Sequence, residues 1–131
     1  IAMEGALKLK ELSYIHAEGY AAGEMKHGPL ALIEDGIPVV VLAPKDRFFE
    51  KTISNMQEVI ARGGKVLMIT DDTSETMSEN IRFKFQIPKA NSTINSFLLT
   101  IPLQFLAYHV ALLKNCDIDK PRNLAKSVTV E

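Results

Sequence analysis

Short apolar runs alternate along this chain with segments of helical periodicity. Pro38–Ala43 and Lys65–Thr70 are nearly uninterrupted apolar runs beside glycine or proline, and each predicts a strand buried on both faces. Ile81–Ile87 predicts a third, weaker strand. The segment between the first two strands carries one helical stripe of apolar residues, at Phe49, Ile53, Met56 and Ile60. Strands without a polar face that alternate with helices indicate an α/β fold with a parallel sheet flanked by helices.

Residues that end or begin helices refine this outline. Asp46 can cap the helix between the first two strands, and Gly63-Gly64 stops that helix. Asn91-Ser92-Thr93 opens a long helix that runs to about Leu113. The pattern before the first strand predicts a helix at Ile1–Tyr14, a short strand at Ile15–Tyr20 and a short helix or turn at Ala21–Ile33.

The chain begins inside a helical pattern and has no capping residue before it. We therefore expect a piece of a longer protein, whose sheet has one more strand ahead of Ile1. Loss of that strand would leave a sheet edge open, so we expect the isolated chain to self-associate. Residues 1–113 form one α/β unit in this interpretation, and residues 114–131 form a tail with no clear period.

Composition excludes several classes of protein. The 131 residues are 47% hydrophobic and carry a formal net charge of −1, which fits one globular domain and disfavours nucleic-acid binding. Phe97–Leu113 has no charged residue and has the length of a membrane span, but its Pro102, Gln104, Tyr108 and His109 favour a helix buried in a soluble core. The single Cys116 excludes a disulfide framework and favours a reducing, cytoplasmic setting.

Glu4, Lys8 and Glu11 are spaced so that they form one charged stripe on an otherwise apolar helix. The stripe fits a solvated face with weak ion pairs, which the spacing alone favours. It also fits a carboxylate held beside an ammonium group in a cleft, where the carboxylate can shuttle protons. Spacing does not decide between the two interpretations.

Two further residues could carry chemistry. His27 lies in a Lys-His-Gly-Pro turn, and it is either an ordinary turn histidine or an acid and base at a cleft. Lys126 in the tail becomes a nucleophile only if burial or nearby positive charge lowers its pKa, which the composition permits without showing it. The histidines lack metal-ligand spacing and no glycine-rich nucleotide loop is present, so we predict neither a metal nor another cofactor.

Three separated segments, Glu4–Glu18, Gly23–Leu32 and Pro121–Glu131, closely resemble the C-terminal end of the isomerizing glutamine–fructose-6-phosphate aminotransferases, also called glucosamine-6-phosphate synthases. The resemblance covers essentially the whole chain. It implies the sugar isomerase (SIS) fold, a three-layer sandwich, with 1–113 as the second SIS subdomain and 114–131 as the catalytic tail. It also implies conversion of fructose 6-phosphate and glutamine to glucosamine 6-phosphate and glutamate by a cytoplasmic homodimer.

The same resemblance implies roles for individual residues. Lys126 matches the lysine that forms a Schiff base with the open-chain sugar, and Glu11 matches the glutamate that moves the proton between C1 and C2. Lys8 matches a lysine at the sugar hydroxyls that orients this glutamate. His27 matches a histidine that assists ring opening from the neighbouring subunit. The implied substrate-binding positions are Glu4, Lys8, Ala125 and Lys126, and the implied ammonia-channel positions are Ala125 and Val128.

The family's glutaminase domain and first SIS subdomain have no counterpart in these residues. We therefore expect that the 131 residues alone make no glucosamine 6-phosphate. One alternative is a standalone SIS module that binds a phosphosugar for regulation without catalysis. Another is a purely structural or interaction domain. The complete motifs around Glu11 and Lys126 favour the catalytic interpretation over both.

Overall fold

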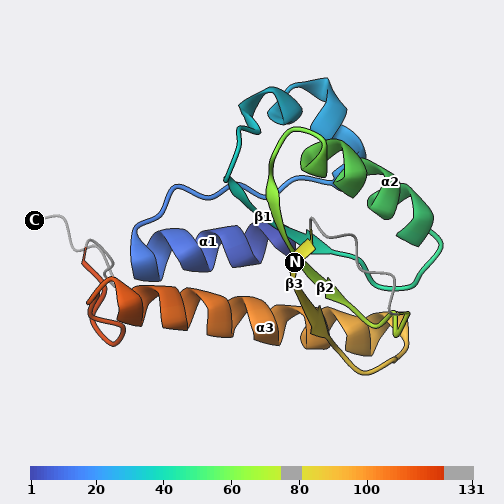
Figure 1. Cartoon of the computed structure of the whole chain (residues 1–131). Helices are drawn as coiled ribbons and strands as arrows, with labels where there is room; N and C mark the ends of the chain where they lie inside the picture. Colours follow the sequence, from blue (N-terminus) through green and yellow to red (C-terminus); the bar gives the residue numbers. More distant parts are fainter. Residues whose placement is uncertain (75–80, 123–131) are drawn as a thin grey trace, which may run out of the picture.

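The computed structural model describes residues 1–74 and 81–122 as an α/β unit (Figure 1). Within them β1 (Pro38–Leu42), β2 (Lys65–Thr70) and β3 (Ile81–Gln86) form a parallel sheet in the order β1-β2-β3. The predicted strands and their parallel arrangement are thus confirmed. Helix α2 connects β1 to β2, and helices cover both faces of the sheet, as the continuous apolar sequences of the strands require.

The helices also lie close to their predicted positions. The structure has α-helices α1 (Ala2–Ser13), α2 (Phe49–Ile60) and α3 (Ser92–Leu113), and 3₁₀ helices η1 (Ala22–His27) and η2 (Pro29–Leu32). The Asn91 side chain accepts a 3.0 Å hydrogen bond from the Ile94 N–H and so caps α3 as expected. Gly63, with a φ of 86°, follows α2 in the left-handed conformation that glycine adopts without strain.

Two local predictions are wrong. Residues 15–20 form no strand, because Gly19 packs directly on the backbone of α1, where a Cβ atom would lie 2.7 Å from the Met3 nitrogen. The segment therefore runs against a helix and has no strand beside it to pair with. Asp46 is not the N-cap of α2, since that position is Phe48. The Asp46 carboxylate instead accepts a 2.7 Å hydrogen bond from the Phe48 N–H and stabilises the turn before the helix.

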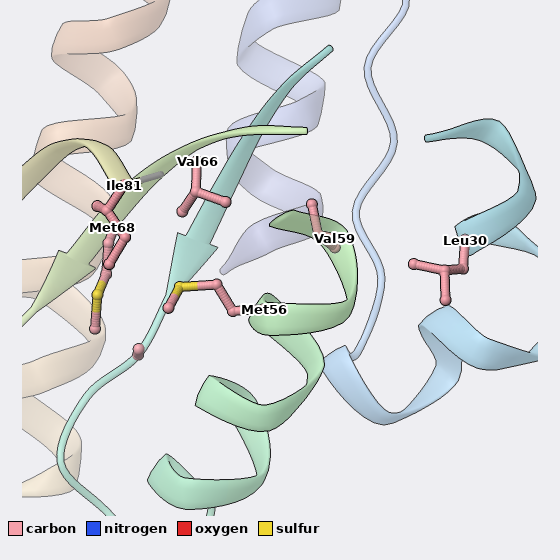
Figure 2. Close-up of a cluster of buried hydrophobic side chains, with 7 residues drawn as sticks. Leu30, Met56, Val59, Val66, Met68 and Ile81 are labelled. Atoms are coloured by element: carbon pink, nitrogen blue, oxygen red, sulfur yellow. The ribbon is translucent and has the colours of Figure 1, made fainter. Parts of the chain in front are cut away.

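Side chains of the sheet alternate between two helical layers. Val66 and Met68 of β2 pack toward α2 and η2, in the cluster that Figure 2 shows with Met56 and Leu30. Ile69 of β2 belongs to a second cluster, which includes Leu99 and Leu103 of α3 and Ile87. The sheet is therefore the middle layer of the three-layer sandwich expected from the sequence.

Helices α1 and α3 lie side by side in the layer opposite α2 (Figure 1). Gly5 of α1 is buried, and a Cβ atom at this position would lie 2.8 Å from Cδ1 of Leu103. The missing side chain lets the two helices approach closely. The packing of α3 on the sheet therefore determines where α1 and its charged stripe lie.

Helix α3 is only partly buried, which corrects the expectation of a core helix. It is the one helix within 1–74 and 81–122 that is long and apolar enough to cross a membrane, and 28% of its apolar window is buried. Leu99, Leu103, Ala107 and Ala111 are buried against the protein. A second apolar stripe is exposed, at Ile94, Phe97, Ile101, Phe105, Tyr108 and Leu112.

We predict that the 131-residue chain self-associates through this exposed stripe, because apolar patches of this extent favour association in water. Phe97 and Phe105 are 69% and 59% exposed, so the double variant Phe97→Glu, Phe105→Glu should place charge on the stripe without disturbing the core. Sedimentation velocity should show a lower average mass for this variant than for the wild type.

The matched control adds two charges to the exposed face of α2, as Ser54→Glu with Gln57→Glu, and should associate like the wild type. Unchanged association of the α3 variant would contradict the prediction. It would leave the edge of β1, which pairs only with β2 among the described residues, as the surface responsible.

Candidate active site

The charged stripe of α1 forms a compact ion-pair network. Lys8 Nζ lies 2.7 Å from Oε2 of Glu11 and 3.7 Å from Oε1 of Glu4. The hydrogen bond to Glu11 raises the pKa of Lys8, against the opposing effect of partial burial, so Lys8 is an ammonium group at neutral pH. The side chains of Lys8 and Glu11 are 32% and 26% exposed, so this is not the fully solvated face that spacing alone favoured.

The ion pair occupies only one of the two carboxylate oxygens of Glu11. Lys8 donates its hydrogen bond to Oε2 of Glu11, and Oε1 has no hydrogen-bond partner among residues 1–74 and 81–122. One oxygen is thus held by an ammonium group while the other can accept a proton from a bound molecule. A partly buried carboxylate in this arrangement suits proton transfer between neighbouring carbon atoms.

A shallow depression of about 530 Å³ adjoins the outer face of α1. Glu4 lines it together with Lys10 and the Glu18–Tyr20 segment, whereas Lys8 and Glu11 do not. The depression is open to solvent and does not enclose a ligand by itself. The depression therefore adjoins the charged stripe at Glu4 and does not contain the Lys8–Glu11 pair.

The start of the C-terminal segment lies at the end of α1. The backbone N–H of Arg122 donates a 2.8 Å hydrogen bond to the hydroxyl of Tyr14, and the Arg122 guanidinium carbon lies 4.2 Å from the Tyr14 ring centroid. Tyr14 follows Glu11 by three residues. Lys126, Ala125 and Val128 lie outside the described residues.

His27 is exposed at the C-terminal end of η1, before Gly28 with a φ of 144°. An ion pair of 3.3 Å between Lys26 and Glu58 ties η1 to α2, on the face of the sheet opposite α1 (Figure 1). No hydrogen bond or ion pair within the described ranges joins His27 to the α1 carboxylates.

A polar cluster that sequence reasoning missed lies at the carboxyl end of the sheet. Asp71 and Asp72 follow β2 and are both 7% exposed. Asp71 accepts a 2.6 Å hydrogen bond from the backbone N–H of Lys45, and Asp72 lies 2.7 Å from Lys45 Nζ. The Thr70 hydroxyl donates to the Ala43 carbonyl and accepts from the Asp72 N–H. The sequence does contain a signal for this cluster. Lys45 follows β1 and Asp71 and Asp72 follow β2, and the carboxyl ends of neighbouring parallel strands meet at one edge of the sheet.

This cluster holds the loop after β1 against the end of β2. The hydrogen bond from Lys45, followed by that from Ser74, lowers the pKa of Asp72 to about 2 despite the opposing effect of burial. The same pair raises the pKa of Lys45. Because each carboxylate already has a partner, the arrangement stabilises the sheet edge rather than forming a ligand site.

The other histidines and the cysteine lie apart from the ion-pair network of α1. His16 is exposed and lies 3.5 Å from Glu18, while His109 on α3 contacts the rings of Phe105 and Tyr108. No group of three histidine, cysteine, aspartate or glutamate residues that could hold a metal ion occurs in the described part of the chain. The Cys116 thiol makes one long 3.9 Å contact with the Lys114 carbonyl in this part of the chain.

Comparison with known proteins gives a consistent result. The sequence pattern of the SIS domain family matches residues 1–114 of the chain. The isomerizing glutamine–fructose-6-phosphate aminotransferases of Rhizobium leguminosarum bv. viciae and Zymomonas mobilis are 60% and 61% identical to the chain over 132 aligned residues. Each alignment covers 100% of this chain and 22% of the relative. The chain thus spans about a fifth of the length of these relatives.

Solved structures share the fold. The C-terminal domain of glucosamine-fructose-6-phosphate aminotransferase from Francisella tularensis is 45% identical, with a TM-score of 0.85, over 90% of this chain and 33% of that one. Glucosamine-6-phosphate deaminase from Thermotoga maritima is 30% identical, with a TM-score of 0.73, over 98% of this chain and 36% of that one. Both similarities confirm the SIS-like α/β architecture.

We predict that Asp72→Asn lowers stability in a pH-dependent way. The pKa of Asp72 in the folded protein is below its ordinary value of 3.8, so its stabilising effect is present above that value and is lost as the pH falls toward about 2. The variant should be less stable than the wild type at pH 7, and the difference should shrink between about pH 4 and pH 2. Urea denaturation across this range measures it.

The matched control, Glu24→Gln, removes an exposed carboxylate of η1 and should follow the wild-type pH dependence. If the wild type and Asp72→Asn kept a constant difference in stability from pH 7 to pH 2, the pair of Asp72 with Lys45 would not be the cause.

Proposed function

This chain belongs to the SIS domain family, and we propose that it forms part of the isomerase site of an isomerizing glutamine–fructose-6-phosphate aminotransferase. The proposed reaction converts fructose 6-phosphate and glutamine to glucosamine 6-phosphate and glutamate. The observation that carries the proposal is the Lys8–Glu11 pair on α1, with a carboxylate oxygen left available beside an ammonium group.

The proposed chemistry begins at Lys126. Its neutral amine attacks C2 of the open-chain keto sugar, and loss of water gives a protonated Schiff base. The cationic nitrogen withdraws electrons from the C1–H bond, so the proton at C1 becomes acidic without forming a free enolate. Ammonia then replaces the lysine nitrogen at C2, which returns Lys126 to its free form.

Glu11 performs the isomerisation in this proposal. Its carboxylate takes the proton from C1, the electrons of that bond form a C1–C2 double bond, and the imine nitrogen becomes an amine. The resulting carboxylic acid returns the proton to C2, and the C1 hydroxyl releases its own proton to water as the C1–O bond becomes that of an aldehyde. The 2.7 Å contact with Lys8 supports this role, because it orients the carboxylate.

Lys8 and Glu4 bind the sugar hydroxyls next to Glu11. The Glu11 carboxylate raises the pKa of Lys8 above its ordinary value of 10.5, so Lys8 is a charged hydrogen-bond donor when the sugar binds. We assign His27 to ring opening in a homodimer, acting from the neighbouring subunit. Its exposed position on the other face of the sheet from α1 supports this assignment.

The remaining parts of the proposal concern a longer polypeptide. The source of ammonia and the phosphate-binding residues are assigned to the parts of the relatives that this chain does not match. Ala125 and Val128 are assigned to the ammonia path. In this proposal, residues 1–113 form the SIS unit and residues 114–131 form the catalytic tail. The proposed enzyme is cytoplasmic and needs no cofactor.

The second candidate function is phosphosugar binding without catalysis, in which the same surface of α1 recognises sugar hydroxyls for regulation. The ion-paired carboxylates of α1 would serve such binding equally well. The two functions differ in whether a covalent bond forms at Lys126, and this difference can be measured directly.

We predict that borohydride traps a covalent adduct of fructose 6-phosphate on Lys126 in a polypeptide of the relatives' length that contains this chain. Lys126→Ala should abolish the adduct, because reduction of a Schiff base fixes the sugar on its lysine. Peptide mass spectrometry locates the modified residue. Lys120→Ala, a control in the same segment, should retain the adduct, whereas sugar binding without any adduct would support the regulatory module.

We also predict that Glu11→Gln separates the two chemical steps. The amide cannot accept the C1 proton, so turnover should fall by roughly 10²–10⁴-fold. Adduct formation on Lys126 should continue, because it does not require this base. Equal loss of adduct and turnover would contradict the assignment of Glu11 to proton transfer and would indicate a role in binding instead.

A further inference from the structure

Tyr14 ends α1 in a conformation that glycine usually adopts. Its φ of 56° lies in the left-handed region, and the Ile15 N–H returns to the Leu9 carbonyl over 3.4 Å, as in a glycine-terminated helix. A bulky residue is strained there, whereas glycine is not. A tyrosine at this position indicates that contacts of its side chain compensate for the strain.

The side chain of Tyr14 contacts Arg122, which lies 108 residues away in sequence. The phenol hydroxyl accepts a 2.8 Å hydrogen bond from the Arg122 N–H. The ring lies under the guanidinium group, whose central carbon is 4.2 Å from the ring centroid. The one side chain thus engages both the backbone and the side chain of Arg122.

Local hydrogen bonds and one left-handed residue also fix the path of the chain between α3 and Arg122. Asn115 takes a left-handed conformation with a φ of 54°, which turns the chain after the helix. The Asp117 carboxylate accepts hydrogen bonds of 3.0 and 2.9 Å from the N–H groups of Asp119 and Lys120. These contacts direct the chain from the end of α3 back to the end of α1, where Tyr14 receives it.

Arg122 precedes Lys126 by four residues. A trans polypeptide spans at most about 3.6 Å per residue, so four residues of chain reach at most about 14 Å. The contact with Tyr14 therefore anchors the chain, four residues before the proposed nucleophile, to the helix that carries Glu11. Such a tether raises the local concentration of the lysine at the site.

We propose that Tyr14 and Arg122 are positioning residues that hold the Lys126 segment for Schiff-base formation. This inference rests on the proposed function. The two residues act through Lys126 and touch neither the sugar nor the transferred proton. Their effect therefore falls on the rate of adduct formation and much less on the affinity for fructose 6-phosphate.

Tyr14→Gly provides the sharpest test, because glycine relieves the backbone strain and removes the contact with Arg122. In a polypeptide of the relatives' length, we expect Tyr14→Gly to keep its thermal stability but to form the borohydride-trapped Lys126 adduct about tenfold or more slowly. The sugar concentration for half-maximal adduct formation should change much less. If the side chain only stabilises the end of α1, glycine should be tolerated without loss of rate.

Two further variants separate the parts of the contact. Tyr14→Phe keeps the ring under the guanidinium group and should slow adduct formation less than Tyr14→Gly does. Tyr108→Phe removes a hydroxyl from the exposed face of α3 and should leave the rate unchanged. If Tyr14→Gly is unstable, the rates of the other two variants test the positioning role. Slower adduct formation in Tyr14→Phe than in Tyr108→Phe supports it, and equal rates overturn it.

The outcomes distinguish this inference from the proposed function. A wild-type adduct on Lys126 together with wild-type rates in Tyr14→Gly and Tyr14→Phe would overturn the positioning role and leave the proposed function intact. Absence of any adduct in the wild type would overturn both. Slower adduct formation in Tyr14→Gly, with half-saturation little changed, would support the positioning role.

Discussion

The close approach of α1 to α3 at Gly5 is the constraint on which the candidate site depends. A side chain at Gly5 would collide with Leu103, which is itself buried against the sheet. Because glycine occupies this position, α1 can lie directly against α3, with its charged stripe only partly exposed beside the contact. The segment after α3 then needs only a short return to reach the end of α1, where Arg122 meets Tyr14.

Local periodicity predicted most of the fold because the elements are locally consistent. The apolar runs of β1 and β2 and the stripe of α2 each bury their own side chains, so pattern and structure agree. The prediction of a strand at residues 15–20 was wrong for the opposite reason. Their short apolar pattern fits a strand, but a strand also needs a neighbour with free backbone groups. Packing of Gly19 on α1 placed the segment beside a helix.

The candidate site was harder to predict, because its important contacts join distant parts of the chain. Spacing placed Glu4, Lys8 and Glu11 on one helical face, as observed, but burial by the surrounding structure decided that the face is only partly solvated. The contacts of Lys45 with Asp72 and of Tyr14 with Arg122 span 27 and 108 residues. No periodicity within a helix or strand reports on such pairs.

The sheet lies between most of the element that carries His27 and the helix that carries Glu11. η1 packs on α2 in one outer layer, while α1 lies with α3 in the other (Figure 1). The two layers approach each other at the edge of β1, where Ala2 of α1 and Met25 of η1 line one cavity. In the proposed enzyme, His27 is assigned to the site of the neighbouring chain, so catalysis there depends on assembly.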